Sequence, residues 1–254
     1  MILIEGLSQV FETKSGAVAA LQDVSFEVNA NEFVTLVGRS GCGKSTLLRA
    51  VSGLLAPTQG TIRIDGELVR RPRRDVSFMF QKPALLPWRN VLQNVMLPGE
   101  FLKLDPHATR TRALDLIELA GLSGFEGAFP HQLSGGMQQR VSLCRSLVQR
   151  PNVLLMDEPF SALDPLTREE LAIELQRIVA EENTTILFVT HSIEEAVLLS
   201  DRIVVLWPRP GRIQEIVTIN VPRPRDLGSP EQAAKLAGSS SRLHALLHHR
   251  GAAA

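Results

Sequence analysis

The chain has 254 residues, and its 27 Lys and Arg balance 27 Asp and Glu, so the formal net charge is zero. Apolar residues make up 44% and charged residues 21% of the chain, which is an ordinary globular composition for one large or two modest domains. A balanced charge argues against a general basic surface for nucleic acid. Nucleic acid is therefore not an expected partner.

The sequence offers no membrane span, secretory signal or disulfide framework. No window approaches the roughly 18 consecutive apolar residues that would cross a bilayer, and the N-terminus lacks a basic segment followed by a long apolar stretch. We therefore expect a cytoplasmic protein. Cys42 and Cys144 have no metal-ligand spacing and are expected to be small apolar residues of the core. The histidines other than His191, including the pair His248 and His249, show no metal-ligand spacing either.

Short apolar runs along the chain predict an α/β fold. Three early alternating runs predict an antiparallel patch beside the main sheet: residues 2–4, 25–28 and 61–64. Stronger apolar runs predict buried strands: residues 33–37, 76–80, 153–156, 186–189 and 203–206. Because these later runs alternate with helical patterns, the main sheet is expected to be mostly parallel and covered by helices.

Composition shifts divide the chain into three parts. Strand-like runs vanish over residues 83–150, where helical spacing predicts an inserted helical subdomain. Residues 1–82 and 151–221 would then form one discontinuous core. Residues 222–254 follow a segment rich in proline and arginine, and we expect them to form a C-terminal tail.

A glycine-rich segment follows the apolar run at residues 33–37. Residues 38–45 read Gly-Arg-Ser-Gly-Cys-Gly-Lys-Ser and match G-x-x-x-x-G-K-[ST] between a strand and a helical pattern. Glycines let the backbone N–H groups approach phosphate, and the start of the helix adds positive potential. Lys44 adds a charge, and the Ser45 hydroxyl can bind Mg²⁺. This phosphate loop predicts nucleoside triphosphate binding, and alone it predicts no more.

Two carboxylates follow the predicted strand at residues 153–156. In a protein with a phosphate loop, Asp157 would hold Mg²⁺ through water, and Glu158 could deprotonate the water that attacks the γ-phosphate. The alternative is that both carboxylates cap the turn before Pro159. Asp164, which is followed by proline, predicts the N-cap of a further helix.

Residues 133–140, Leu-Ser-Gly-Gly-Met-Gln-Gln-Arg, form a second helix start that could bind an anion. One chain needs only one cradle for a triphosphate, so a second one suggests a nucleotide closed from two sides by two copies of the chain. Taken alone, Ser-Gly-Gly is also a common turn.

The order of these motifs resembles the ATP-binding subunit of an ABC transporter, over nearly all of the chain up to about residue 220. The resemblance implies a P-loop NTPase fold of ABC type, with ATP and Mg²⁺ as ligands. It implies these ATP-binding residues: Phe11, Gly38, Arg39, Ser40, Gly41, Cys42, Gly43, Lys44, Ser45, Thr46, Ser134, Gly135 and Gly136. It implies Glu158, His191 and Gln81 as catalytic residues. It implies Ser45, Gln81 and Asp157 at the metal, and Asp164 in communication between subunits.

Several of these assignments have alternatives. Phe11, with Val18 nearby, would stack on adenine, but it could also be an ordinary core phenylalanine. His191 would contact the γ-phosphate as the switch histidine, but it could be a histidine satisfied at the end of a strand. Met137 stands where the family often has glutamine, and its side chain is not expected to touch phosphate.

The resemblance also implies partners and a location. It implies a head-to-tail homodimer with two ATP molecules at the interface, bound to membrane permease subunits at the cytoplasmic face of the membrane. The segment after Gln81 contains Leu85, Leu86 and Trp88, which would grip the permease or else fill the core of the helical subdomain. The amino-acid sequence of this segment is similar to that of ATP-binding subunits from importers of the nitrate, sulfonate and taurine group, which also use a solute-binding protein. Importers of pyrimidine precursors have a similar sequence in this segment.

Two other classes of protein stay open from the sequence. A soluble ABC ATPase without a transport role would use the same ATP motifs, although such proteins commonly carry coiled-coil insertions or tandem domains. A single-site P-loop kinase or GTPase would leave residues 133–137 and His191 without a role.

Overall fold

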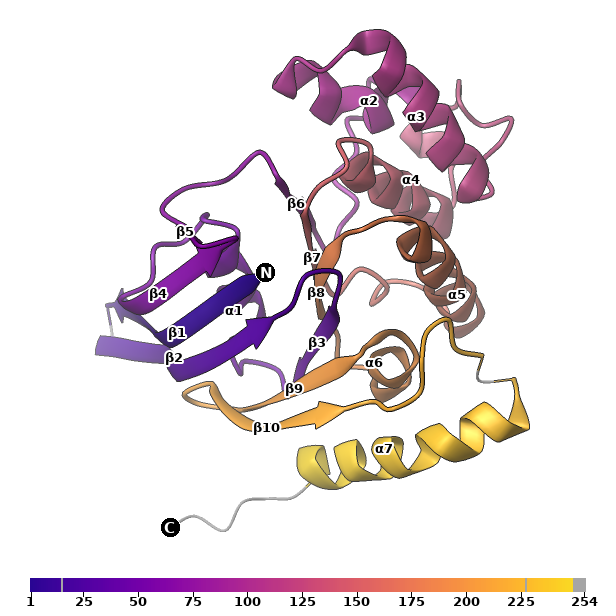
Figure 1. Ribbon diagram of the computed structural model, residues 1–254. Helices are drawn as coiled ribbons and strands as arrows, with labels where there is room; N and C mark the ends of the chain where they lie inside the picture. The colour runs from indigo at the N-terminus through magenta and orange to yellow at the C-terminus, as the bar shows by residue number, and fades with distance from the viewer. Residues whose placement is uncertain (15, 227, 249–254) are drawn as a thin grey trace.

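Two β-sheets carry the architecture in the computed structural model, which describes residues 1–14, 16–226 and 228–248 (Figure 1). The smaller sheet has the order β2-β1-β4-β5 and is antiparallel throughout. Its strands are β1 (Ile2–Thr13), β2 (Gly16–Val28), β4 (Gln59–Ile64) and β5 (Glu67–Leu68). The expected antiparallel patch is therefore confirmed, with β1 and β2 longer than the alternating runs predicted.

The larger sheet has the order β10-β9-β3-β8-β7-β6. Its strands are β3 (Phe33–Gly38), β6 (Val76–Met79), β7 (Val153–Asp157), β8 (Thr185–Val189), β9 (Arg202–Trp207) and β10 (Arg212–Thr218). Every pair is parallel except β9 with β10. The five apolar runs predicted as buried strands all form this sheet, and β3 and β8 are buried along their whole length. No strand was predicted from the sequence at β10.

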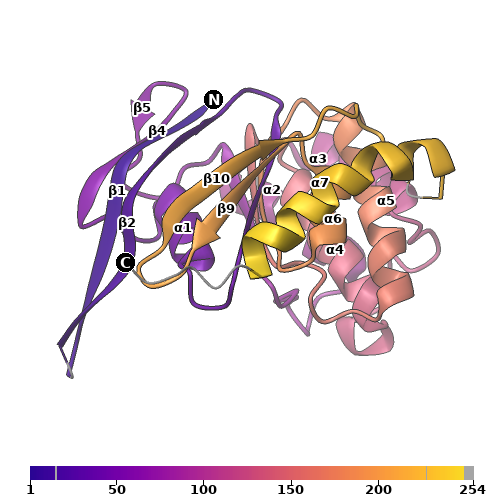
Figure 2. The same cartoon turned by 90° about the horizontal axis from the view of Figure 1, so that it is seen from below.

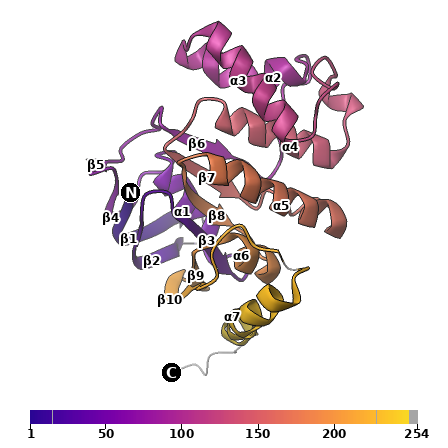
Figure 3. The ribbon, with the colours of Figure 1, turned by 45° about the vertical axis from the view of Figure 1, so that its right-hand side comes forward.

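The described residues form seven α-helices and one 3-10 helix. They are α1 (Lys44–Val51), α2 (Val91–Leu102), α3 (Pro106–Leu119), the 3-10 helix η1 (Pro130–Gln132), α4 (Gly135–Leu147), α5 (Pro165–Glu181), α6 (Ile193–Leu199) and α7 (Pro230–His248). In Figure 3, α2, α3 and α4 lie together at the top and the small sheet lies at the left. Residues 83–150 are helical without a strand in this fully described range, but the proposed boundaries of the subdomain stay a prediction.

Side chains at the helix starts explain where several helices begin. Asn90 forms a capping box with Gln93 at the start of α2. Ser134, Asp164 and Ser192 each accept a hydrogen bond from a backbone N–H in the first turn of α4, α5 and α6. The N-cap predicted at Asp164 is thus confirmed.

The predicted C-terminal tail contains a helix. Helix α7 lies beside β10 and α6 in Figures 1 and 2, and it buries Leu236 and Leu243 against α6 and β9. Arg242 pairs with Glu215 of β10 at 2.6 Å. The sequence predicted no helix at residues 230–248, and the extent of the C-terminal tail stays a prediction, while residues 227 and 249–254 lie outside the described residues.

The parallel sheet brings three loops to one edge. β3, β8 and β7 are neighbours, so their carboxyl ends meet. Such an edge is where ligands bind in open α/β sheets. Across the described ranges, no helix has both the length and the apolar character needed to cross a bilayer.

Candidate functional site

The phosphate loop joins β3 to α1 in a tight turn. A Cβ on Gly38 would lie 2.6 Å from the Cys42 sulfur, and one on Gly43 would lie 2.5 Å from Leu21. Gly43 is also the N-cap of α1, with a φ of 88° that side chains disfavour. Glycine is therefore required here by space at both positions and by backbone conformation at Gly43. The sequence prediction of a strand, a glycine turn and a helix start is confirmed.

Lys44 is folded back over this loop. Its Nζ donates to the Gly38 carbonyl oxygen over 2.9 Å, and its side chain is only 6% exposed. The ammonium lies 3.9 Å from Glu158 Oε1. The loop thus combines the amide groups at a helix start with one buried positive charge, an arrangement suited to a polyphosphate.

Oxygen ligands for a hard cation meet where β7 ends. Ser45 Oγ donates to Asp157 Oδ1 over 2.8 Å. Burial raises the pKa of Asp157, although the Ser45 hydrogen bond opposes this shift. A carboxylate in this position is costly without a counter-charge, and Mg²⁺ prefers oxygen ligands of this kind. The residues present therefore fit a magnesium ion.

Glu158 lies between the cation site and the switch histidine. Its backbone is in the left-handed region at φ 45°, and its N–H donates to the Val189 carbonyl oxygen over 3.0 Å. Its Oε2 lies 3.4 Å from His191 Nδ1. Strained backbone of this kind is common at functional sites. The turn directs a half-exposed acid toward an exposed histidine, so the structure does bring Lys44, Glu158 and His191 together.

Gln81 reaches the same edge from β6. Its Nε2 donates to Ser161 Oγ over 3.0 Å, and the Ser161 hydroxyl donates to the Glu158 carbonyl oxygen over 2.9 Å. Gln139 of α4 donates to the carbonyl oxygens of Gln81 and Pro159. The amide of Gln139 thus joins α4 to the segments on both sides of the site, a link that the sequence reading missed.

The signature segment (residues 133–137) contacts α5 and lies apart from the phosphate loop. Gly135 is exposed, and a Cβ there would lie 4.0 Å from Leu163 Cδ2, whereas a Cβ on Gly136 would lie 2.6 Å from Thr167 Cγ2. Among the described residues, no hydrogen bond or ion pair joins residues 134–136 to residues 38–46. A single chain therefore presents two separate helix starts.

The burial of the two cysteines and of three apolar residues tests further expectations from the sequence. Cys42 and Cys144 are buried and unpaired, and burial raises the pKa of Cys144 to about 12. Phe11 is 38% exposed and pairs with Val18 across the β1–β2 hairpin, so the alternative of a core phenylalanine was wrong. Trp88 is 71% exposed and does not fill the core of the helical region. Leu85 does pack against that core.

The C-terminal helix reaches the phosphate loop. Arg39 Nε donates to the Leu247 carbonyl oxygen of α7 over 3.1 Å. Gly38, Arg39, Ser40 and His191 line a cavity of about 360 Å³ whose far wall is His244 and Leu247 of α7. Sequence reasoning could not foresee this contact because it gave α7 no element.

Comparison with known proteins decides the family. A family profile described as "ABC transporter" matches residues 21–161, more than half of the chain. The chain belongs to the ABC transporter ATP-binding family. It is accordingly an ATP-binding protein and an ATPase coupled to transport.

Two relatives and one solved structure illustrate the likeness. An uncharacterised ABC transporter ATP-binding protein of Methanocaldococcus jannaschii is 50% identical over 228 residues, which cover 90% of this chain and 85% of the relative. A taurine import ATP-binding protein of Rhizobium johnstonii is 46% identical over 84% of this chain and 82% of its own length. The ATP-binding cassette MJ0796, solved as a dimer in a post-hydrolysis state bound to ADP and Pi, has a TM-score of 0.77 at 31% identity. That comparison covers 87% of this chain and all of the solved cassette. The ABC-type P-loop NTPase fold expected from the motifs is thereby confirmed.

Proposed function

We propose that this ABC ATPase energises the import of a small solute, with hydrolysis performed at the edge formed by β3, β7 and β8. Lys44 would hold the phosphates, and Glu158 would act as general base toward the attacking water. The observation that supports this most is the convergence of the Lys44 ammonium, the Glu158 carboxylate and the His191 ring within 4 Å contacts. A positioned carboxylate base of this kind contributes about 10²–10⁴-fold to a rate.

Ser45 and Asp157 would hold Mg²⁺, and Gln81 would complete the metal site. When bound, the ion supplies positive charge that stabilises the phosphate oxygens. Lys44 would bind the phosphates as a point charge, while the N–H groups of the phosphate loop orient them. His191, which is exposed and 3.4 Å from Glu158, would contact the γ-phosphate and keep Glu158 directed at the water.

Two copies of the chain would complete each site. Ser134 and Gly135 are exposed in one copy, as a surface that receives the nucleotide of a second copy would require. Ser134, Gly135 and Gly136 of one copy would cover the phosphates held by Lys44 of the other, and Asp164 would lie at the contact between copies. To move such a dimer from 1:99 to 99:1 in favour of closure, bound ATP must favour the closed state by about 5.5 kcal/mol. The dimeric state of the solved cassette supports this arrangement.

The segment after Gln81 would meet the membrane permease. Trp88 is exposed although it is large and apolar, and Arg145 of α4 donates to the Ala84 carbonyl oxygen over 2.9 Å, which holds the segment on the helical region. An exposed aromatic on an anchored loop is typical of a protein interface. The ATPase would thus work at the cytoplasmic face of the membrane, with a solute-binding protein as an indirect partner.

The solute is proposed to be a small molecule or ion of the sulfonate, taurine or nitrate type. The name of the Rhizobium relative supports taurine import within this group. Uptake measured with taurine, alkyl sulfonates, nitrate and pyrimidine precursors would choose among the candidates. Uptake of a pyrimidine precursor alone would replace the proposed class with the alternative.

Replacement of Glu158 tests the catalytic proposal. Glu158→Gln removes the base and keeps the shape of the side chain, so turnover should fall by about 10²–10⁴ while ATP still binds and joins two copies. ATP hydrolysis, ATP titration and sedimentation measure the three properties. Full turnover in Glu158→Gln would refute the role of Glu158. A variant that stays monomeric with Mg²⁺ and ATP would favour a single-site kinase or GTPase arrangement.

Co-purification tests the transport role. A soluble ABC ATPase would carry the same site, so activity alone does not separate the two functions. Recovery of a multi-span membrane protein with the tagged chain supports the importer. Recovery of only soluble partners, together with full ATPase activity, would favour the soluble alternative.

A further inference from the structure

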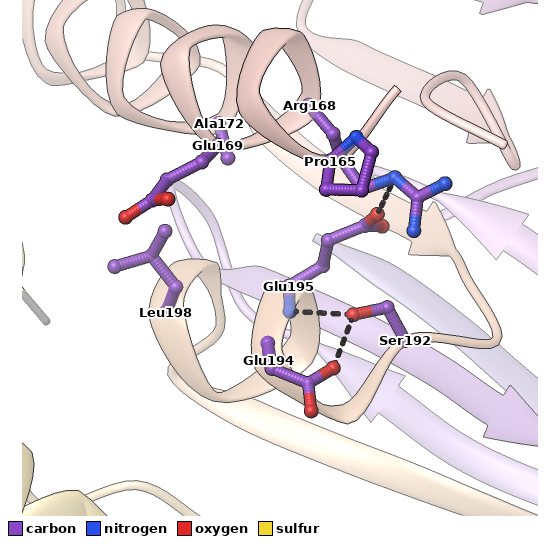
Figure 4. Close-up of a pocket in the computed structure, with 8 residues that line it drawn as sticks. All are labelled: Pro165, Arg168, Glu169, Ala172, Ser192, Glu194, Glu195 and Leu198. Atoms are coloured by element: carbon purple, nitrogen blue, oxygen red, sulfur yellow. Dashed lines mark hydrogen bonds and ion pairs between the residues drawn. The ribbon is translucent and has the colours of Figure 1, made fainter. Parts of the chain in front are cut away.

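Glu195 is a buried acid that joins α6 to α5 (Figure 4). It is 6% exposed, and its Oε2 accepts a hydrogen bond from Thr190 Oγ1 over 2.5 Å. Its Oε1 lies 3.6 Å from Arg168 Nε on α5, and the Arg168 Nε makes no hydrogen bond of its own in the described part of the chain. One carboxylate therefore contacts two segments that are distant in sequence.

Both of these segments end at the candidate site. Arg168 NH2 donates to the Leu163 carbonyl oxygen over 3.1 Å, within the D-loop (residues 161–164). The Thr190 hydroxyl accepts the N–H of Ser192 over 3.0 Å, so it fixes the backbone on both sides of His191. A continuous series of polar contacts thus runs from the D-loop through Arg168, Glu195 and Thr190 to the switch histidine.

Stability of the helix start does not explain Glu195. The N-terminus of α6 is capped by Ser192, whose hydroxyl accepts the N–H of Glu195 over 3.1 Å. Burial raises the pKa of Glu195, which means that the charged form is costly there. An apolar residue of similar volume would often be at least as stable as a buried ion pair. A contact of this cost is more consistent with positioning than with stability.

Helices α5 and α6 contribute buried apolar side chains to one core cluster, with Leu171 and Leu175 from α5 and Leu198 and Leu199 from α6. A cavity of about 310 Å³ lies beside the Arg168–Glu195 pair, and Figure 4 shows Ala172 and Leu198 on opposite sides of it. The Arg168–Glu195 ion pair therefore adds a polar link between the two helices beside this cavity.

We propose that Glu195 and Arg168 are positioning residues for ATP hydrolysis, which hold the D-loop and His191 in one geometry. This inference rests on the function proposed above for Glu158 and His191. A displacement of the D-loop, such as contact with a second copy would cause, would pass through Arg168 and Glu195 to the backbone of His191. A displacement of about 1 Å at a reacting group can cost about 100-fold in rate.

The test compares variants at both ends of the series. Glu195→Gln keeps an acceptor for Thr190 and removes the charge that Arg168 faces, and Thr190→Val removes the hydroxyl. Each should lower kcat by about 10- to 100-fold while the Kd for Mg-ATP stays within about twofold. Glu169→Gln is the matched control, because this exposed acid on the same turn of α5 makes no hydrogen bond or ion pair with the described residues. It should leave kcat unchanged.

Coupling between the variants separates positioning from general damage. The double variant Arg168→Gln/Glu195→Gln should be no slower than the slower single variant, because both remove the same link. Thr190→Ser, which restores the hydroxyl, should recover most of the activity lost in Thr190→Val. Thermal unfolding of every variant identifies those that are simply destabilised.

Three outcomes would overturn the proposal. The first is a kcat within about twofold of that of the unmodified chain in both Glu195→Gln and Thr190→Val. The second is an equal loss of kcat and of ATP affinity in these variants. The third is a loss of kcat in Arg168→Gln/Glu195→Gln that equals the product of the two single losses. If the Glu195 variants fail to fold, Thr190→Val and Arg168→Gln carry the same test from either end. If Glu158→Gln and His191→Ala lose activity and the Glu195 and Thr190 variants do not, this inference alone fails. If Glu158→Gln keeps full turnover, the proposed function itself has failed.

Discussion

Gly136 of the signature segment is the position where one added methyl group should disturb the site most directly. A Cβ there would lie 2.6 Å from Thr167 Cγ2, about 1 Å closer than carbon atoms in ordinary van der Waals contact. Thr167 lies in the first turn of α5, where its backbone N–H donates to Asp164 Oδ1 over 3.1 Å, so the contact is relieved only if its side chain turns or the two helices move. Gly136→Ala should therefore push α4 and α5 apart at the signature segment.

The magnitude follows from two opposed effects. Overpacking of this kind costs about 1–3 kcal/mol, whereas Gly to Ala in a helix contributes up to about 1 kcal/mol in the other direction. Gly136→Ala should thus lose up to about 2 kcal/mol of stability. Thr167→Ser removes the clashing methyl and keeps the hydroxyl that faces Asp164. In that background the same change at Gly136 should be neutral or stabilising by up to about 1 kcal/mol.

Chemical and thermal unfolding of the four proteins in this cycle measure the coupling. We expect an interaction free energy of about 1–3 kcal/mol, which corresponds to about 2–4 °C in Tm for each kcal/mol in a chain of this size. ATP hydrolysis should fall in Gly136→Ala and recover with Thr167→Ser. Additive effects on stability would show that the steric contact is not the cause, and the account of Gly136 would have to be abandoned.

Three further changes are expected to have separate effects. Lys44→Ala should raise the Kd for ATP by about 10- to 100-fold, because a charged hydrogen bond contributes about 1.5–3 kcal/mol; unchanged affinity in a nucleotide titration would contradict the cradle. Arg225→Met should lose at least about 3 kcal/mol in denaturant unfolding, because buried carbonyl oxygens such as that of Ser200 lose their donor; a loss below 1 kcal/mol would contradict this. The Arg73 hydrogen bond lowers the pKa of Asp75, so this acid contributes stability that is complete above about pH 5 and is lost as the pH falls through its lowered pKa. Asp75→Asn should remove that part of the pH dependence, and an unchanged acid titration of stability would contradict it.

Motifs coded in contiguous sequence were predictable. The phosphate loop depends on residues 38–45 alone, because glycine geometry, a preceding strand and a following helix determine it locally. The end of β7 at Asp157 is equally local, since an apolar run stops at a carboxylate. Once β3, β7 and β8 are known to be parallel, their carboxyl ends must meet, and Glu158 and His191 follow.

Contacts between distant side chains were not predictable. Glu195 reads as one of two acids in the first turn of a helix, where such residues are common, and nothing in its neighbourhood signals burial. Its importance depends on the position of Arg168 on another helix, which only the packing of α5 on α6 defines. Gln139 likewise stands between the polar residues Gln138 and Arg140 in the sequence, although its amide lies between two backbone segments.

The C-terminal helix is a third case, in which the helical spacing of apolar residues was present in the sequence but weak. Leu236, Leu243 and Leu247 follow a spacing of seven and four residues, which places them on one face of a helix, but glycine and serines between them weaken the pattern. The face is nevertheless buried against α6 and β9. The final turn then supplies a carbonyl oxygen to Arg39, and a cation is favourable at the C-terminus of a helix. The burial of these leucines therefore also holds one residue of the phosphate loop, so that the stability of α7 and the geometry of the nucleotide site are physically linked.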